Sequence, residues 1–287
     1  MLIDTHSHLN FSAFKDSYKT VIKRALDKNI WLINVGSQST TSERAVKIAN
    51  EYDEGVYATV GLHPTHLFEM DVDESEIDSS VKFKSRKEDW DKEFYKKLAR
   101  DKKGGAIGEV GLDYHFAPKD IGLDIIKKRQ QEIFCQALDL ANELNLPVII
   151  HSRDTHNDII PILKSYLDAG RLKRRGVLHC FTAGFDEARK YLDLGFLISF
   201  TGIITFTPRP KQIESQEKIL NAIKNIPLEK IMVETDAPYL SPEPFRGQQN
   251  EPLYVEYVAR KIAKIKNISF EEAAETTTKT AKNFFQI

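Results

Sequence analysis

Residues 123–151 read LDIIKKRQQEIFCQALDLANELNLPVIIH and contain one unit of the pattern that decides the fold. Apolar side chains recur in its first part at the spacing of an amphipathic helix: Ile126, Ile133, Ala137, Leu140 and Leu144. A short apolar run over residues 147–150 then predicts a buried strand, and His151 follows it directly. The stretch therefore predicts a helix that leads into a buried strand with a polar side chain at its end.

Short apolar runs of this kind occur eight times, separated by longer segments with helical patterns. They cover residues 2–5, 30–35, 56–60, 105–107, 147–150, 176–178, 196–200 and 230–233. Eight βα units without a linker favour an α/β fold, the (β/α)8 TIM barrel. The alternative is an open doubly wound sheet, which usually carries a glycine-rich phosphate loop after its first strand. Because none follows residues 2–5, we expect one barrel domain over residues 1–287.

The composition is that of a large globular core and excludes several classes of protein. With 41% hydrophobic and 29% charged residues, the 287-residue chain is not disordered. Its 41 basic and 42 acidic residues argue against a generally basic nucleic-acid binder but permit a local positive patch. Cys135 and Cys180 fit neither a disulfide framework nor a cysteine zinc site. Without a long apolar run or a basic signal region, we expect a cytoplasmic protein with no membrane association, and a monomer.

The connection after the third run, residues 67–103, is longer than the others. It is acidic over residues 69–78 and rich in lysine over residues 82–103. Because charge runs usually lie on exposed faces, we expect a solvated helix with a mobile loop, inserted into the barrel pattern. The alternative is that its lysines help to hold a polyanion near the mouth of the barrel.

Side chains that bind metals gather at the ends of the apolar runs. In Asp4-Thr5-His6-Ser7-His8, strand alternation sends Asp4, His6 and His8 to one face, which is the interior in a barrel. Buried imidazoles without partners are costly, so this pair favours a metal. One His-x-His pair is nevertheless a weak signal.

The same kind of side chain ends four other runs: Glu109, His151, His179 and Asp236. All lie at the C-terminal ends of strands, where barrel active sites are found. Four imidazoles and two carboxylates exceed what one tetrahedral ion needs. They predict two divalent ions, magnesium, manganese or zinc, that share a bridging carboxylate, for which Glu109 is the candidate.

Six motifs carry a family resemblance that spans the chain. They are His6-Ser7-His8, Gly61-Leu62-His63-Pro64, Gly108-Glu109-Val110-Gly111-Leu112-Asp113-Tyr114, His151-Ser152-Arg153-Asp154, His179-Cys180-Phe181-Thr182 and Glu234-Thr235-Asp236-Ala237-Pro238-Tyr239-Leu240. In this order they resemble the TatD family of metal-dependent deoxyribonucleases. The resemblance implies an amidohydrolase-type TIM barrel that hydrolyses DNA phosphodiester bonds, and we expect a 3′-to-5′ exonuclease acting on a single strand or an end.

The resemblance also implies how the ligands are shared. His6, His8 and Glu109 would bind one ion, and Glu109, His151 and His179 the second. Asp236 would lie on the first ion beside the water.

One motif departs from the family pattern. Where members often have Arg-Gly-Lys-Arg-Asn-Glu-Pro, this chain has Arg246-Gly247-Gln248-Gln249-Asn250-Glu251-Pro252. Arg246 is kept as a candidate substrate contact, but two positive charges are absent. Because phosphate neutralisation supplies most non-selective DNA binding, this argues against strong DNA affinity.

The mechanism expected from these residues is attack by a metal-activated water. Asp236 would orient that water and accept its proton. Arg153 follows His151 by two positions, so we expect its guanidinium to bind the phosphate, with a loop salt bridge as the alternative.

The remaining candidates are assigned to supporting roles. His63 either touches a phosphate or makes a structural hydrogen bond before Pro64, and His115 is a further candidate for touching substrate. We expect Asp113, Glu234 and Asp4 to contact the ligand residues and not the ions. Asp113 would orient a ligand histidine or Arg153.

Two other classes of function compete with the nuclease. The same ligands would serve an amidohydrolase-type enzyme acting on a small amide, lactone or ester, or on an aminoacyl-tRNA ester. Many such binuclear enzymes bridge their ions with a carboxylated lysine, so Glu109 favours the nuclease. A non-catalytic protein that binds nucleic acid or metal is disfavoured by the complete ligand set.

Overall fold

The computed structural model describes residues 1–73, 82–118 and 120–287. The chain divides into two compact units. Unit 1 consists of Met1–Ile33 and Leu178–Ile287, and unit 2 is Asn34–Val177. The two boundaries fall inside strands β2 (Ile30–Val35) and β8 (Gly176–Leu178).

Eight strands form one sheet in the order β1-β2-β3-β6-β7-β8-β9-β10, with neighbours hydrogen-bonded. This order is the order along the chain, apart from one inserted hairpin, and each of the eight strands is followed by at least one helix. The strands pair in parallel where the register is defined, as between β3 and β6, β6 and β7, and β9 and β10. The elements therefore alternate as predicted for a (β/α)8 barrel.

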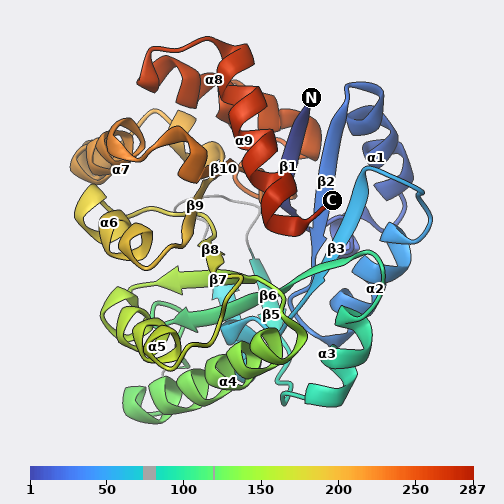
Figure 1. Cartoon of the computed structure of the whole chain (residues 1–287), viewed down its shortest axis with the longest axis vertical. Helices are drawn as coiled ribbons and strands as arrows, with labels where there is room; N and C mark the ends of the chain where they lie inside the picture. The colour runs from blue at the N-terminus through green and yellow to red at the C-terminus, as the bar shows by residue number, and fades with distance from the viewer. Residues whose placement is uncertain (74–81, 119) are drawn as a thin grey trace. The chain divides into compact units, whose positions relative to one another are not determined.

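Unit 1 carries the first and last parts of the chain. Its elements, besides its parts of β2 and β8, are β1 (Leu2–Ser7), α1 (Tyr18–Asp27), α6 (Phe185–Asp193), β9 (Leu197–Phe200), α7 (Ile213–Asn225), β10 (Ile231–Val233), α8 (Val255–Lys266) and α9 (Phe270–Phe285). Helices α8 and α9 lie side by side, as Figure 1 shows in red, and α9 also contacts β1 and β10. The core of unit 1 contains Ile3, Phe14, Phe196 and Phe200, each at most 1% exposed.

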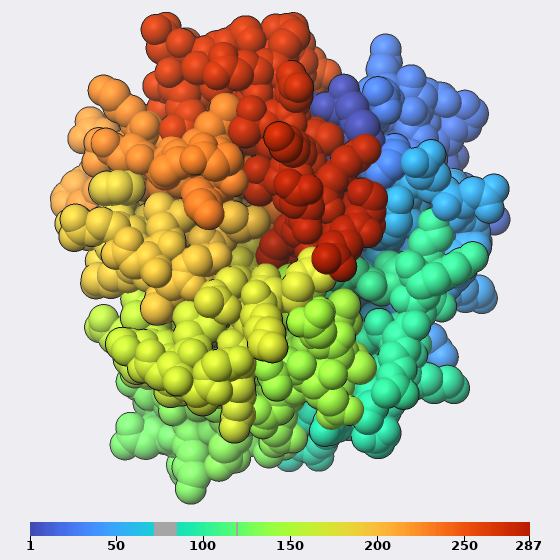
Figure 2. Space-filling model, in the orientation of Figure 1, coloured from blue at the N-terminus to red at the C-terminus, as the bar shows by residue number. Residues whose placement is uncertain are grey.

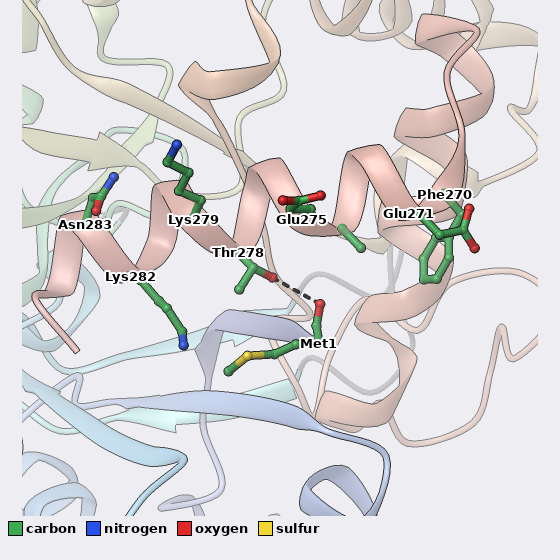
Figure 3. A pocket seen from close by; sticks show the side chains of 9 residues that line it. Met1, Phe270, Glu271, Glu275, Thr278, Lys279, Lys282 and Asn283 are labelled. Carbon is green, nitrogen blue, oxygen red and sulfur yellow. Dashed lines mark hydrogen bonds between the residues drawn. The ribbon is translucent and has the colours of Figure 1, made fainter.

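A groove of about 510 Å³ opens on the outer face of α9. Figure 3 shows it between that helix and Met1, whose carbonyl accepts a hydrogen bond from Thr278 Oγ1 at 3.2 Å. Figure 2 shows the red surface of the C-terminal helices to which it belongs. The groove shares no residue with the ligand groups described below.

Unit 2 carries the middle of the chain. Its elements, besides its parts of β2 and β8, are α2 (Ser39–Ala49), β3 (Val56–Val60), β4 (Met70–Asp73), β5 (Lys82–Ser85), α3 (Lys92–Ala99), β6 (Gly104–Asp113), α4 (Leu123–Leu144), β7 (Val148–Arg153) and α5 (His156–Asp168). Helix α2 packs on β3 and α4 packs on β6. Figure 1 shows α4, in green, as a long helix of this unit.

The helix and the strand predicted within residues 123–151 are confirmed as α4 and β7. Helix α4 covers Leu123–Leu144, and Ile126, Ile133, Ala137 and Leu140 are buried in it. It ends where Asn145 adopts a left-handed conformation (φ 53°), which stops a helix. Leu144 is only half-buried because it lies at that end.

The described part of the inserted segment contains strands as well as the predicted helix. We expected a helix and a loop over residues 67–103; the structure has α3 but also an antiparallel hairpin of β4 and β5. Residues 74–81, which include much of the predicted acidic run, lie outside the described residues. Of the predicted solvated lysines, Lys92 and Lys96 pair with Glu143 on α4 at 2.7 and 2.5 Å. Among the described residues, no helix has the length and apolar character needed to cross a bilayer.

Candidate metal centre

The first ligand group lies in unit 1, where β1 meets the segment after β10. Asp236 N donates to His6 O at 2.8 Å and His8 N donates to Ala237 O at 2.7 Å, which ties the two segments together. The Nε2 atoms of His6 and His8 lie 3.2 Å apart, and Asp236 Oδ1 lies 3.2 Å from His8 Nε2. One ligand atom from each of these three side chains falls within 4.8 Å of the other two. The three therefore form a compact donor set.

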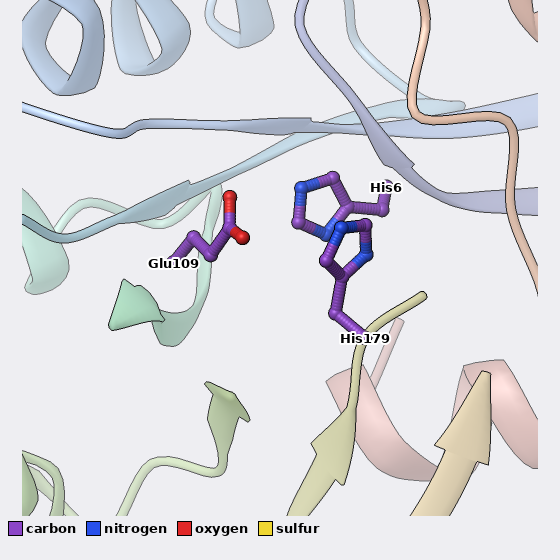
Figure 4. A group of neighbouring side chains, drawn as sticks. All are labelled: His6, Glu109 and His179. Carbon is purple, nitrogen blue, oxygen red and sulfur yellow. The ribbon is translucent and has the colours of Figure 1, made fainter. Parts of the chain in front are cut away.

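His179 lies against this group in the same unit. Its ring stacks on that of His6, as Figure 4 shows. The two ring centroids lie 3.5 Å apart, and the interplanar angle is 23°. His179 Nε2 lies 3.9 Å from Asp236 Oδ1. Three imidazoles thus surround one carboxylate. Burial alone raises the pKa of the Asp236 carboxyl, but the hydrogen bond with His8 and the charge of His179 lower it overall.

Two buried carboxylates support the ligands of unit 1. Glu234 Oε1 lies 2.8 Å from His179 Nδ1 and accepts a hydrogen bond from Cys180 N at 2.7 Å. Asp4 accepts hydrogen bonds from His6 N and from both the N and Oγ1 atoms of Thr235. Glu234 thereby contacts a ligand imidazole, whereas Asp4 joins the backbones that carry His6 and Asp236. Burial raises the pKa of the Asp4 carboxyl well above its ordinary value.

The second ligand group lies in unit 2, on β6, β7 and the end of β3. His151 Nδ1 lies 2.9 Å from Glu109 Oε1, and its Nε2 lies 2.8 Å from Asp113 Oδ2. His63 Nε2 lies 3.4 Å from the same Glu109 oxygen. Although burial alone lowers the pKa of His151, its hydrogen bonds to Asp113 and Glu109 raise it to about 9. In the metal-free protein His151 is therefore an imidazolium held between two carboxylates.

Two glycines let the strands of unit 2 approach closely enough to form this group. A Cβ on Gly111 would lie 2.0 Å from His151 O, and Gly111 has φ +153°, a conformation that favours glycine. A Cβ on Gly61 would lie 2.7 Å from Glu109 O. Strand β6 also extends to Asp113, beyond the predicted end at residue 107, because the register shift between Ile107 and Val110 carries the pairing past Gly108. Glu109 and Asp113 therefore lie within a strand rather than after one.

The predicted substrate-binding residues Arg153, His115 and Arg246 each have a different neighbouring side chain. Arg153 ends β7 in register with Asp113, and its guanidinium lies 4.8 Å from the centre of the Phe116 ring. His115 is half-exposed, with Nδ1 3.6 Å from Asp154 Oδ2. In unit 1, the Arg246 guanidinium lies 3.6 Å above the Phe206 ring.

His63 makes the structural hydrogen bond that was one of the two alternatives, and it also faces Glu109. Its Nδ1 lies 2.7 Å from Thr65 Oγ1 and accepts from Thr65 N at 3.2 Å, which is a structural hydrogen bond next to Pro64. Its Nε2 faces Glu109, so His63, Glu109 and His151 form a second compact donor set. The only signal for this in the sequence is the position of His63 at the end of the third apolar run.

Sequence reasoning also missed the residue that holds Asp113 in place. Gln130 on α4 is buried; its Nε2 donates to Asp113 O and its Oε1 accepts from Asp113 N, both at 2.8 Å. A buried Gln on the apolar face of a predicted helix was the available signal, since such a side chain needs partners.

The donor chemistry of both groups fits divalent metal ions. Imidazole and carboxylate ligands suit zinc, manganese and magnesium to different degrees. In unit 1, two imidazole nitrogens face each other at 3.2 Å beside a carboxylate, an arrangement that a shared cation satisfies at all three atoms. The described residues present such donor sets in each unit.

Comparisons with known proteins support this chemistry. A family model described as TatD related DNase matches residues 3–286. YabD of Bacillus subtilis (strain 168), described as an uncharacterized metal-dependent hydrolase, is 38% identical over 292 residues and is covered fully, as is this chain. YcfH of Escherichia coli (strain K12), described in the same words, is 33% identical and aligns over 100% of this chain and 96% of its own.

A solved structure matches the whole chain as well. The crystal structure of YJJV, a TatD homologue from Escherichia coli k12, superposes with a TM-score of 0.79 and 28% identity, over 100% of this chain and 98% of that one. Together with the strand order, this similarity confirms the predicted (β/α)8 barrel fold.

Proposed function

The chain belongs to the TatD related DNase family of metal-dependent hydrolases, and from this premise we propose that it hydrolyses phosphodiester bonds in DNA, as a cytoplasmic 3′-to-5′ exonuclease. The observation that carries the proposal is the set of imidazoles and carboxylates that each unit brings together on and just after its strands. A protein that only binds nucleic acid has no need for these buried donors, whereas metal-assisted hydrolysis uses such side chains to hold its ions.

The proposed ligands are those the sequence predicted. His6, His8 and Asp236 would hold one divalent ion, His151 and His179 a second, and Glu109 would be shared by both. Bound ions of this kind lower the pKa of a coordinated water towards about 7 and offset charge on phosphoryl oxygens. Because His151 is an imidazolium in the metal-free protein, it must lose a proton before it can act as a ligand.

The protein's own groups would complete the reaction. Asp236 is ionised, since its pKa is lowered despite burial, so it accepts the proton of the attacking water. Arg153 ends β7 two residues beyond His151, and its guanidinium matches two phosphoryl oxygens at once. Asp113 and Glu234 fix the ring orientation of His151 and His179 through their short contacts.

Hydrolysis of a 3′-labelled single-stranded oligonucleotide tests the proposal. Metal-stripped protein would receive magnesium, manganese or zinc, and Asp236→Asn would be compared with Asp186→Asn, a matched variant of an exposed carboxylate on α6. We expect stepwise, metal-dependent release of nucleotides, with a loss of roughly 10²–10⁴ in rate for Asp236→Asn. Asp186→Asn should keep the rate of the natural chain.

Two outcomes would overturn the proposal. An Asp236→Asn protein that cleaves at near-full rate with unchanged metal content would remove Asp236 as the base. No cleavage of DNA with any metal would favour a hydrolase of small amides or esters, which panels of such substrates would then identify. Gln248 and Gln249 are exposed and uncharged, which favours that second outcome because the family pattern considered above has Lys and Arg there.

A further inference from the structure

Two aromatic side chains stand beside the unit 1 ligand group. The Phe11 ring stacks on the His8 ring, with centroids 4.2 Å apart and an angle of 13°. Tyr239 follows Asp236 by three residues, and its ring lies 6.5 Å from that of Phe11 at 61°. The two rings therefore form a short aromatic surface next to His8 and Asp236.

This surface differs from the ordinary core of the unit. Leu9 and Phe14, on either side of Phe11 in the sequence, are 0% and 1% exposed, whereas Phe11 and Tyr239 are only half-buried. Both are large aromatic side chains, whose burial contributes most when it is complete. Because Phe11 and Tyr239 are partly exposed to water, they lack some of that stabilisation. Such partial exposure is expected of a surface that a ligand covers.

The backbone holds both rings in fixed positions. Phe11 N donates to His8 O at 2.9 Å, so Phe11 is placed by the same turn as His8. Tyr239 N donates to Asp236 O at 2.9 Å, and Tyr239 O accepts from the buried Asn250 amide at 2.6 Å. A preorganised pair of rings loses little freedom when something stacks on it.

We propose that Phe11 and Tyr239 form a stacking site for one nucleobase of the strand whose phosphate is cleaved. The inference rests on the proposed function and names the part of the substrate that the site recognises. A base lies one sugar away from its phosphate, so a phosphate at the His8–Asp236 group brings a base to the adjacent rings. Aromatic stacking accepts every base and supplies affinity without positive charge. Such affinity does not depend on positive charge at the exposed Gln248 and Gln249.

Oligonucleotides lacking one base test this site. A short single strand would be compared with two versions carrying a tetrahydrofuran abasic unit at the 3′-terminal or the penultimate position. Phe11→Leu and Tyr239→Leu remove the ring face but keep apolar volume. Phe270→Leu, a half-buried aromatic on α9 in the same unit, is the matched control. Metal content per chain is measured for each variant, because Phe11 contacts His8.

The natural chain should lose about tenfold in kcat/KM on one of the two abasic strands, mainly through KM. Phe11→Leu and Tyr239→Leu should lose a similar factor on the intact strand and show little further loss on the abasic one, whereas Phe270→Leu should behave like the natural chain. If the abasic penalty persists unchanged in both variants, or if no abasic penalty exists, the stacking site is wrong while the nuclease stands. If the natural chain cleaves no strand at all, the proposed function fails and the stacking site fails with it.

Discussion

The ligand groups of the two units differ in the partners that surround their buried ionisable side chains. In unit 2, His151 is held between Glu109 and Asp113, so that its positive charge is balanced at both ring nitrogens. In unit 1, the His6 and His8 rings bring two nitrogens within 3.2 Å of each other, with His179 stacked on His6. Unit 2 therefore balances its charges without an ion, whereas unit 1 crowds imidazoles around Asp236.

This difference indicates which of the two ligand groups depends more on a bound cation. Imidazole nitrogens that face each other gain from a shared ion, since the ion binds a lone pair from each ring. An imidazolium between carboxylates must instead lose its proton first. We therefore expect the unit 1 group to respond more to the loss of a ligand, and the unit 2 group to bind metal with a stronger dependence on pH.

The largest expected effect separates His8 from His63. His8→Ala removes a donor from the crowded unit 1 group, so we expect the loss of about one metal ion per chain and of roughly 10³ in kcat, corresponding to several kcal/mol of transition-state stabilisation. His63→Ala should keep its metal and change mainly KM. Elemental analysis and steady-state kinetics measure both. Equal metal loss in the two variants would place His63 among the ligands.

Asp113 in unit 2 and Glu234 in unit 1 are buried carboxylates that each contact one proposed ligand histidine. Asp113→Asn and Glu234→Gln keep size but remove charge from the partner of His151 and of His179. Groups of this kind typically contribute 10–100-fold to metal affinity or activity. Competition with a chelator measures the affinity. If neither variant weakens metal binding, the two carboxylates are structural.

Asn250 positions the turn of unit 1 that carries Asp236. Its amide donates to Thr235 O and Tyr239 O at 2.9 and 2.6 Å, on either side of Asp236, which has φ +60°. Asn250→Ala leaves two buried carbonyls without this donor, so we expect about 1–3 kcal/mol less stability in urea unfolding. Asn225→Ala, which removes an exposed amide that bonds Asn221 O, should change stability little. Similar losses for the two variants would contradict a special role for Asn250.

The smallest effect is expected at the surface of unit 2, where Glu143 pairs with Lys92 and Lys96. The hydrogen bonds from these two lysines lower the pKa of Glu143 to about 2. Because the folded pKa lies below the unfolded one, this stabilisation is present above about pH 4.5 and is lost as the pH falls towards 2. Lys96→Ala should raise the pKa of Glu143, as NMR titration of its carboxyl carbon would show. An unchanged value would mean that Lys92 alone sets it.

Much of the fold followed from local patterns. The eight apolar runs correspond to β1, β2, β3, β6, β7, β8, β9 and β10, and helix α4 contains the apolar residues whose spacing predicted it. Ser269 caps α9 by accepting from Glu272 N, as its sequence pattern indicates. The six motifs also sufficed to recognise the family, which the whole-chain match confirms. Such features depend on neighbours in the sequence, so they are visible in it.

Other features depend on residues far apart in the chain. The full length of β6 was missed because Gly108 and Gly111 interrupt the apolar pattern, and only pairing with β7 shows why glycine is needed there. The β4–β5 hairpin was missed because its strands are short and charged. His66 follows the third apolar run, and nothing in the local pattern shows that it is only 9% exposed or that burial lowers its pKa to about 4.

The metal-binding residue types on or near the strands could be predicted from the sequence, because strand alternation and apolar spacing are local properties. The tertiary structure decided which of those side chains meet within each unit. It placed His63 on Glu109, set Gln130 against the backbone of Asp113, and left Phe11 and Tyr239 half-exposed beside His8. The contacts of Gln130 with Asp113, of His63 with Glu109 and of Phe11 with Tyr239 join residues 17, 46 and 228 positions apart, and their distances are fixed only when strands and helices pack.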